Sequence, residues 1–312
     1  MTVILTVTLN PSVDIQYRVK HFQENRIHRA AAVSKTAGGK GLNVTRVLHQ
    51  LGEEVTACGF AGGHLGSFIE EELNHHGIMH YFTPIAGETR NCIAIIHDGK
   101  QTEVLEKGPT IAEKEIETFL ATFQEKAEKV EVITISGSLP EGVPENFYQQ
   151  LIDIAVKANK HVLLDTKSSL IQNTLENQYI PFLIKPNQEE FEELAGIICS
   201  YEEDVIKALR KPVFNELSWV IVTLGKNGAI AKYGDKIYQV ACPTVEAVNP
   251  VGSGDAVIAG LAAGCRRGLE GEDFIRFGIV MGVLNALEEQ TGRISLNQME
   301  YYLKQIEVKK IS

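Results

Sequence analysis

Short apolar runs alternate along the chain with longer stretches in which apolar residues recur at helical spacing. The runs, rich in β-branched residues, predict strands at Val3–Leu9, Glu54–Gly59, Glu131–Ile135, His161–Leu164, Phe182–Ile184 and Trp219–Thr223. Helices are expected at 42–51, 112–128, 145–158, 188–195, 254–267 and 272–289. Such alternation predicts an α/β fold with a mainly parallel sheet covered by helices.

Two segments, 14–36 and 90–107, break this pattern. In the second, Asn91–His97 and Thr102–Glu106 flank an Asp-Gly turn, which is typical of a β-hairpin. We expect both segments to form a small second sheet. Because no repeat, low-complexity tract or Pro/Ser linker divides the chain, we expect one domain over residues 1–312, with a lid built from these excursions. Lids of this kind usually gate small-molecule sites.

Composition and charge exclude several classes of protein. Of the 312 residues 44% are hydrophobic and 22% charged, which is ordinary for a globular protein. The net charge of −10 disfavours nucleic acid and anionic membranes as partners. Five widely spaced cysteines indicate reduced thiols and a cytoplasmic location, and no apolar run reaches the roughly 18 residues of a membrane span. Neither cysteines nor histidines show the spacing of a zinc site.

The most informative motif runs from Asn249 to Asp255 and contains Gly252, Ser253 and Gly254 at the start of a predicted helix. A glycine pair opening a helix exposes free backbone N–H groups, which form an anion site together with the helix dipole. Asp255 in the first turn could simply cap these groups. The functional interpretation makes it a general base beside a hole for a phosphoryl anion.

A second glycine cluster, Thr36-Ala37-Gly38-Gly39-Lys40-Gly41-Leu42-Asn43, also runs from a probable strand into a helix. By itself it is equally consistent with a flexible turn carrying a solvated Lys40. Neither cluster is a Walker loop, because no Gly-Lys is followed by Ser or Thr, and the first strand lacks a G-x-G-x-x-G motif.

Together the two clusters resemble the signatures of the PfkB (ribokinase-like) carbohydrate kinase family. The first is matched by residues 38–45 with Gly52 and Gly62, the second by 249–255, and the resemblance covers nearly the whole chain. Within the family the chain is most similar to tagatose-6-phosphate kinases and next to 1-phosphofructokinases, through 36–48, 87–92, 105–109 and 136–140. The resemblance implies a Rossmann-like αβα sandwich with a β-sheet lid, often used for dimerisation. It also implies phosphoryl transfer from MgATP to a sugar hydroxyl.

The resemblance assigns roles at the sugar end of the site. Asp255 would take the proton of the acceptor hydroxyl while the N–H groups of Gly252, Ser253 and Gly254 hold the phosphoryl charge. Sugar contacts would come from Asp14, Gly38, Gly39 and Asn43, although Asp14 could instead form an Asx turn. The far phosphate of the substrate would meet Lys40, Arg90, Arg29, Lys107 and Ser138, each cation being by itself a plausible solvated surface charge.

The nucleotide end is assigned in the same way. Lys185-Pro186-Asn187-Gln188-Glu189-Glu190 resembles the family's N-x-x-E motif, in which Asn187 and Glu190 organise Mg²⁺ and its waters; the alternative is an ordinary helix start after a proline. Thr223, Gly225 and Gly228 would lie at the ATP phosphates and ribose, although Asn227-Gly228 alone indicates a hairpin turn. Asn285 matches an adenine-side asparagine.

Two departures from tagatose-6-phosphate kinases set this chain apart. Ala256-Val257 follows Asp255 where Ser-Thr is usual, and Thr166-Lys167-Ser168-Ser169 follows Asp165 where a small Cys/Ser-Ser-Gly segment is usual. Lys167 is expected at the carboxyl end of a parallel strand, where α/β sheets bind ligands. We expect it to add a cation near the nucleotide phosphates.

These observations predict an ATP- and Mg²⁺-dependent kinase that converts tagatose 6-phosphate into the 1,6-bisphosphate, a step of lactose and tagatose 6-phosphate catabolism. The nearest alternative is phosphorylation of fructose 1-phosphate at C6. A catalytically silent sensor of sugar phosphate or nucleotide is a third reading, because fold alone does not establish activity. A kinase for nucleosides or free sugars would not need Lys40, Arg90 and Lys107 together.

Overall fold

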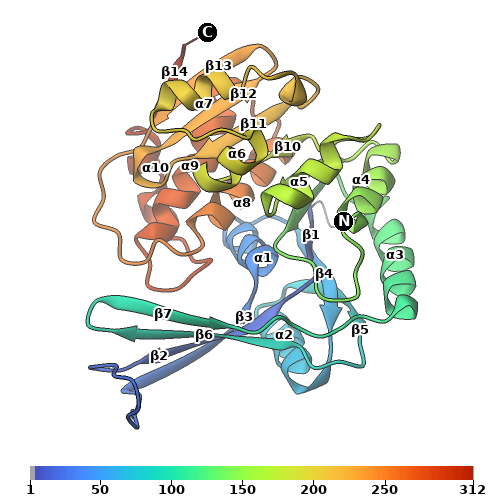
Figure 1. Cartoon of the computed structure of the whole chain (residues 1–312), viewed down its shortest axis with the longest axis vertical. Helices are drawn as coiled ribbons and strands as arrows, with labels where there is room; N and C mark the ends of the chain where they lie inside the picture. The colour runs from blue at the N-terminus through green and yellow to red at the C-terminus, as the bar shows by residue number, and fades with distance from the viewer. Residues whose placement is uncertain (1–3, 312) are drawn as a thin grey trace.

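The main sheet organises the molecule. The computed structural model describes residues 4–311, and these contain a ten-stranded sheet in the order β14-β13-β12-β11-β10-β9-β8-β1-β4-β5 (Figure 1). Its strands are β1 (Ile4–Thr8), β4 (Val55–Ala61), β5 (Met79–Pro84), β8 (Val132–Ser136), β9 (His161–Asp165), β10 (Leu183–Ile184), β11 (Trp219–Thr223), β12 (Ala229–Tyr233), β13 (Lys236–Ala241) and β14 (Glu307–Lys310). From β5 across to β11 neighbouring strands pair in parallel, and β12, β13 and β14 continue the sheet antiparallel. Parallel strands place their carboxyl ends at one edge, where α/β proteins bind ligands.

Helices cover both faces of this sheet. One face packs against α1 (Lys40–Gln50), α2 (Gly63–His75), α8 (Ser253–Arg266) and α9 (Gly271–Ala286), and the other against α3 (Glu113–Ala127), α4 (Phe147–Lys157), α5 (Ser168–Leu175), α6 (Gln188–Ala195) and α7 (Glu202–Ala208). The strand residues alternate between the two cores: Ile4 and Leu163 belong to the first, Leu5 and Leu164 to the second. The short helix α10 (Met299–Leu303) precedes β14. The predicted αβα sandwich is confirmed.

The two irregular segments of the sequence form a second sheet. It has the order β3-β2-β6-β7, with β2 (Ser12–Arg18), β3 (Ala32–Gly38), β6 (Arg90–His97) and β7 (Lys100–Leu105), and it extends away from the main sheet in Figure 1. The strands β2 and β6 pair in parallel, while β3 and β7 pair antiparallel at the two edges. The predicted hairpin is therefore present, with Asp98 and Gly99 at its turn.

The predicted elements are confirmed with ends displaced by a few residues. Trp219–Thr223 and the helix over 188–195 match fully, whereas the predicted helix 272–289 ends earlier, at Ala286. Val3, the first residue of the first predicted strand, lies outside the described residues. The expectations did not include β5, the antiparallel strands β12 to β14 or the helices α2, α5, α7 and α10. No helix in the described range combines the length and apolarity that a bilayer span requires.

A buried carboxylate ties the end of α8 to the turn before β4. The Glu53 side chain is 1% exposed, its Oε1 lying 2.7 Å from Arg267 and its Oε2 3.1 Å from Arg266. We expect Glu53→Ala to lower the free energy of unfolding by about 2 kcal/mol. The reason is that the two arginines at the end of α8 lose their ion pairs with this carboxylate. Urea denaturation measures this, with the isosteric Glu53→Gln as the matched variant. An unchanged midpoint for both variants would contradict a stabilising role.

Candidate active site

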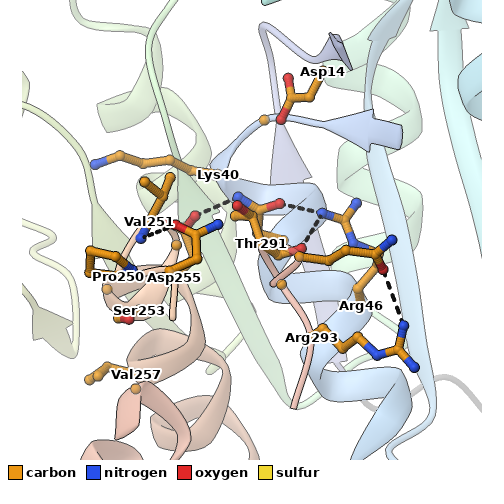
Figure 2. A pocket seen from close by; sticks show the side chains of 18 of the residues that line it. Asp14, Lys40, Arg46, Pro250, Val251, Ser253, Asp255, Val257, Thr291 and Arg293 are labelled. Carbon is orange, nitrogen blue, oxygen red and sulfur yellow. Dashed lines mark hydrogen bonds between the residues drawn. The ribbon is translucent and has the colours of Figure 1, made fainter. Parts of the chain in front are cut away.

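A cleft of about 1480 Å³ opens at the carboxyl ends of the central strands, beneath the small sheet. Its walls come from β1, α1, the ends of β8 and β9, the start of α6 and the start of α8. Figure 2 shows that Asp14, from the small sheet, and Asp255, from α8, come from different elements, and that Lys40 lies between Asp14 and the loop of Pro250 and Val251. This volume suffices for two small ligands side by side.

Most of the site residues expected from the sequence line this cleft. They are Asp14, Gly39, Lys40, Asn43, Arg90, Ser138, Lys167, Lys185, Asn187, Glu190, Thr223, Gly225, Gly228, Gly252, Ser253, Gly254 and Asp255. The topology therefore brings together residues that are more than two hundred positions apart in the chain.

Four expected residues lie elsewhere. Arg29 is exposed in the connection between β2 and β3, and Lys107 lines a shallow surface hollow after β7. Gly38 lies just behind the cleft wall, where a Cβ would overlap the Asp14 carboxyl group. Asn285 is fully buried: its amide donates to the Val251 carbonyl at 3.0 Å, and its oxygen accepts from Gly292 at 2.9 Å. Asn285 thus holds the glycine loop in place from behind.

The glycine loop forms the start of α8. Gly252 is the N-cap residue with φ 81°, a left-handed conformation that favours glycine. The Ser253 N–H group donates to the Pro250 carbonyl at 3.2 Å. Within residues 4–311 the N–H groups of Gly252 and Gly254 have no hydrogen-bond acceptor. Two of the three expected N–H groups are therefore available to an anion, and the helix dipole adds positive potential there.

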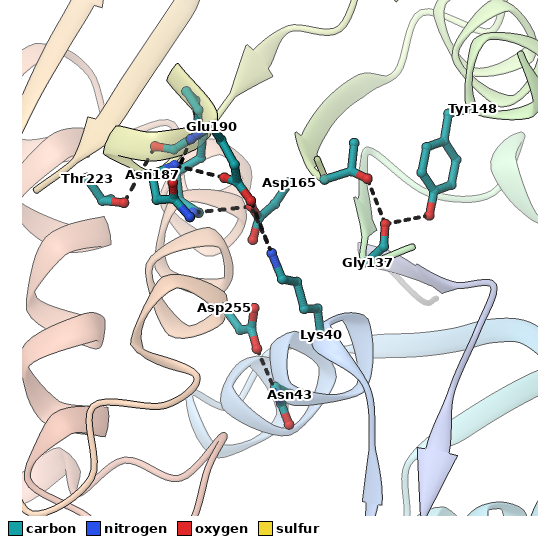
Figure 3. A network of polar contacts seen from close by, with 12 residues as sticks. Lys40, Asn43, Gly137, Tyr148, Asp165, Asn187, Glu190, Thr223 and Asp255 are labelled. Atoms are coloured by element: carbon teal, nitrogen blue, oxygen red, sulfur yellow. Dashed lines mark hydrogen bonds and ion pairs between the residues drawn. The ribbon is translucent and has the colours of Figure 1, made fainter. Parts of the chain in front are cut away.

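Asp255 does not cap its own helix. Its Oδ2 accepts a hydrogen bond of 2.7 Å from the Asn43 amide nitrogen, and the residue is 6% exposed (Figure 3). Burial, supported by the Asp165 charge, raises the pKa of Asp255 to about 7, while Lys40, Asn43 and Lys185 act in the opposite direction. A carboxylate with this pKa can accept a proton at neutral pH, as a general base must.

A cluster of opposite charges lies beside Asp255. Asp165, at the end of β9, is 1% exposed, and its Oδ1 lies 3.3 Å from the Lys185 ammonium. The same atom lies 3.8 Å from the Lys40 ammonium (Figure 3). The Lys40 ammonium is also 3.8 Å from Glu190 Oε1. Asp165, with smaller contributions from Asp255 and Glu190, raises the pKa of Lys40 against the effect of burial. The cleft therefore holds two fixed ammonium groups, which suits phosphate.

Asn187 and Glu190 form the N-terminus of α6. The Asn187 side chain accepts from the Glu190 N–H group at 2.8 Å, and Glu190 Oε2 accepts from the Asn187 N–H group at 2.9 Å, a reciprocal capping box. Asn187 Oδ1 and Glu190 Oε2 therefore cap the helix, as the interpretation of this segment as an ordinary helix start expects. Glu190 Oε1 remains directed at the cleft.

The oxygen atoms around Glu190 are suited to Mg²⁺. Within the described residues no three His, Cys, Asp or Glu side chains gather closely enough to hold a metal by themselves. Glu190 Oε1, which faces the cleft and the Lys40 ammonium, and the buried Asp165 carboxylate are hard oxygen donors in a cleft that suits phosphates. They fit Mg²⁺ of the kind that is held largely by substrate phosphates and water.

The end of the cleft beside the small sheet is preorganised by short contacts. The Ser12 hydroxyl donates to Asp14 Oδ1 at 2.6 Å, and burial raises the pKa of Asp14. The Arg90 guanidinium donates to the Asn10 carbonyl at 3.1 Å and to the Glu106 carbonyl at 2.9 Å, which fastens β6 to the end of β1. Ser138 accepts from the Asn10 amide at 3.3 Å. These groups lie at fixed positions before any ligand binds.

Two further polar residues line the cleft, Asp165 and Arg46, and neither was predicted from the sequence to be a site residue. An acid directly after the buried run His161–Leu164 was the available signal for Asp165, because strand ends carry ligands in α/β folds. Arg46 had only its position one helical turn after Asn43.

Comparison with known proteins agrees with this geometry. Residues 7–298 match the model of the pfkB family carbohydrate kinases. Among solved structures, a Staphylococcus aureus protein described as a candidate phosphofructokinase is 32% identical, with a TM-score of 0.83 and 99% of each chain covered.

Two more solved structures extend the comparison. Phosphofructokinase-2 from Escherichia coli, in complex with fructose-6-phosphate, is 26% identical with a TM-score of 0.88, covering 98% of this chain and 99% of that chain. A Thermotoga maritima protein described as a candidate 1-phosphofructokinase is 25% identical with a TM-score of 0.91, covering 99% of this chain and 100% of that chain.

Proposed function

Because the chain belongs to the pfkB family of carbohydrate kinases, we propose that it transfers the γ-phosphoryl group of ATP to a hydroxyl of a ketohexose phosphate. The observation that carries this proposal is the arrangement at the start of α8. A buried carboxylate with a pKa of about 7 lies directly beside unpaired N–H groups of Gly252 and Gly254. General base and anion hole are the two parts that phosphoryl transfer to an alcohol needs.

In the proposed reaction the acceptor hydroxyl gives its proton to Asp255 as its oxygen forms a bond to the γ-phosphorus. The bond from that phosphorus to the β,γ-bridging oxygen breaks, and ADP leaves. The Gly252 and Gly254 N–H groups and the α8 dipole stabilise the charge on the equatorial oxygens. Most of the catalysis is thus positioning and electrostatics.

The remaining charges position the nucleotide. Lys185 lies where it can neutralise phosphate oxygens of the nucleotide. Lys40, which the family resemblance assigns to the phosphate of the sugar substrate, contacts the same carboxylate, so Asp165 holds both ammonium groups in place. Glu190 would hold Mg²⁺ through water. Asn187 would support it by fixing Glu190 through the capping box at the start of α6. When bound, this ion would neutralise phosphate charge. The loop with Thr223, Gly225 and Gly228 would contact the phosphates and ribose.

For the acceptor we propose D-tagatose 6-phosphate, phosphorylated at C1, with fructose 1-phosphate as the second candidate. The first is supported by the motifs shared with tagatose-6-phosphate kinases, by Arg90 and Ser138 at the sugar end, and by the similar Escherichia coli enzyme that was solved with a hexose 6-phosphate. The second is supported by the Thermotoga maritima neighbour.

The test is ATP-dependent kinetics on tagatose 6-phosphate, fructose 6-phosphate and fructose 1-phosphate side by side. The highest kcat/KM is expected on tagatose 6-phosphate. Preference for fructose 1-phosphate would establish the second candidate instead. Absence of turnover on all three, with no difference between the wild type and Asp255→Asn, would overturn the proposed function.

Lys167 gives a separate prediction. It is exposed on the cleft rim at the N-cap position of α5, next to Asp165 and Thr166. We expect Lys167→Ala to raise the KM for ATP roughly fivefold with kcat nearly unchanged, because one ground-state phosphate contact is lost. Lys160→Ala, which removes a lysine from the turn after α4, is the matched control. Unchanged ATP kinetics in Lys167→Ala would show that this lysine is an ordinary surface charge.

We also propose that the small sheet acts as a lid and pairs with a second copy of the chain. Its register places two neighbouring rows of apolar residues on the same face of the sheet. One row is Val33, Tyr17 and Ile95, and the next is Ile15, Ile93 and Val104. Val33 and Val104 are more than half exposed, and an apolar sheet face of this kind indicates a protein partner. A homodimer is expected in sedimentation, and the double variant Val33→Lys, Val104→Lys should be monomeric.

A further inference from the structure

Arg46 occupies the centre of a polar network on the far side of Asn43 from Asp255. Its guanidinium donates to the Asn43 side-chain oxygen and to the carbonyl of Ala37 at the end of β3. It also donates at 3.2 Å to the carbonyl of Thr291 after α9 (Figure 2). Helix α1 carries both Asn43 and Arg46, one turn apart, so their side chains share a face. The guanidinium therefore touches three separate elements.

The contact with Arg46 decides which way the Asn43 amide points. An arginine side chain has five donors and no acceptor, so the Asn43 oxygen must face Arg46 and its nitrogen must face away. That nitrogen donates to Asp255 Oδ2 at 2.7 Å. With the amide turned over, an oxygen would face the Asp255 carboxylate, and the two acceptors would repel each other.

We propose that Arg46 is a positioning residue of the active site, which holds the Asn43 amide in the orientation that donates to Asp255. The inference rests on the proposed function of Asp255 as general base. Arg46 acts entirely through its neighbours, and its contacts also link the end of lid strand β3 to the loop at Thr291.

The loop at Thr291 makes this link tight. A Cβ at Gly292 would lie 3.0 Å from Arg46, and a Cβ at Gly252 would lie 2.3 Å from the Thr291 methyl group. The loop is thus packed between the guanidinium and the anion hole. A shift of β3 at Ala37 would move Arg46, and with it the donor on which Asp255 depends.

The charges around the two groups set the direction of the effect. Asp255 faces Asp165, which raises its pKa, and Lys40 and Lys185, which lower it together with the Asn43 hydrogen bond. Arg46 faces the carboxylates of Asp14, Asp255 and Glu72, and burial lowers its pKa. Loss of Arg46 frees the Asn43 amide to turn and removes a positive charge near Asp255. Both changes raise the pKa of Asp255.

The experiment is the pH dependence of kcat for Arg46→Met. We expect the acidic limb of the profile to move to higher pH by about one unit. At a pH below the midpoint of the limb kcat should then be roughly tenfold lower than in the wild type, whereas at pH 9 it should be less than threefold lower. The matched control is Gln50→Met, since the Gln50 amide donates from α1 to the backbone carbonyls of Gly292 and Arg46, both at 2.9 Å, and not to Asn43. A displaced limb in Gln50→Met would indicate general loosening of the loop and overturn the proposal.

The Asn43→Ala background separates orientation from charge. If Arg46 acts through the amide, Asn43→Ala moves the limb upward, and adding Arg46→Met moves it by less than a further third of a unit. Full additivity of the two shifts would show that the guanidinium acts only by its charge, and it would overturn the positioning role.

A readout without turnover keeps this proposal distinct from the proposed function. Carbon-13 NMR of labelled aspartate carboxyl groups identifies Asp255 as the signal that Asp255→Asn lacks. Its titration midpoint should rise by about one unit in Arg46→Met and stay unchanged in Gln50→Met. An unchanged midpoint in Arg46→Met overturns the inference, even if the protein proves to be an active kinase. A raised midpoint supports it, even if no tested sugar phosphate is turned over.

Discussion

Asp255→Asn is expected to lower kcat about 10³-fold while leaving the KM values for ATP and sugar phosphate within threefold of the wild type. The amide has almost the volume of the carboxylate and still accepts from Asn43, but it cannot take a proton from the acceptor hydroxyl. Steady-state kinetics near pH 8 measure this. A kcat within tenfold of the wild type would show that Asp255 is not the base.

The same substitution should stabilise the protein at alkaline pH. In the folded state the pKa of Asp255 is about 7, against an ordinary value of 3.8. The folded protein therefore favours the neutral carboxylic acid over the charged carboxylate. Its contribution to stability is therefore present at pH 4 and is lost as the pH rises towards 7 and above. We expect Asp255→Asn to raise the free energy of unfolding by about 2–4 kcal/mol at pH 8 and by little at pH 4.

Urea denaturation of both proteins at the two pH values tests this sign. A variant that is less stable than the wild type at pH 8 would mean that Lys40 and Lys185 compensate the buried charge in full. Together with the kinetics, a stability gain at the cost of activity is typical of a charge that is retained for function.

Gly252→Ala should abolish most of the activity and also destabilise the fold. The residue has φ 81°, and a Cβ there would come within 2.3 Å of the Thr291 methyl group. We expect a loss of about 2–3 kcal/mol in the free energy of unfolding, because strain and overlap add. The displaced N–H group should lower kcat at least ~10²-fold. Thermal unfolding and kinetics at a temperature where both proteins are folded separate the two effects.

Gly254→Ala is the matched control for stability. A Cβ at Gly254 would meet the flexible end of the Lys185 side chain, with its Nζ at 3.4 Å, and the position is helical. Its stability should therefore equal or exceed that of the wild type. Equal destabilisation by the two substitutions would contradict a special backbone requirement at Gly252.

The fold was predictable because its signals are local. Val220 and Ile221 belong to opposite cores, so a strand buried on both faces appears as a continuous apolar run that marks its own position. The antiparallel strands β12 to β14 carried no comparable signal. Polar residues such as Lys232 and Gln239 interrupt their apolar runs, and only pairing with β11 makes the segment a continuation of the sheet.

The sequence by itself determined six central strands of the main sheet, most of the long helices, the two glycine clusters and the Asp255 motif, because each depends on neighbouring residues and on backbone conformations that glycine permits. Only the tertiary structure decided how these parts act together. It placed Asp165 against Lys40 and Lys185, buried Asn285 behind the glycine loop, and aligned Arg46, Asn43 and Asp255. Electrostatic interactions and hydrogen bonds depend on separations in space of a few ångström, and the crossovers of the sheet set these separations.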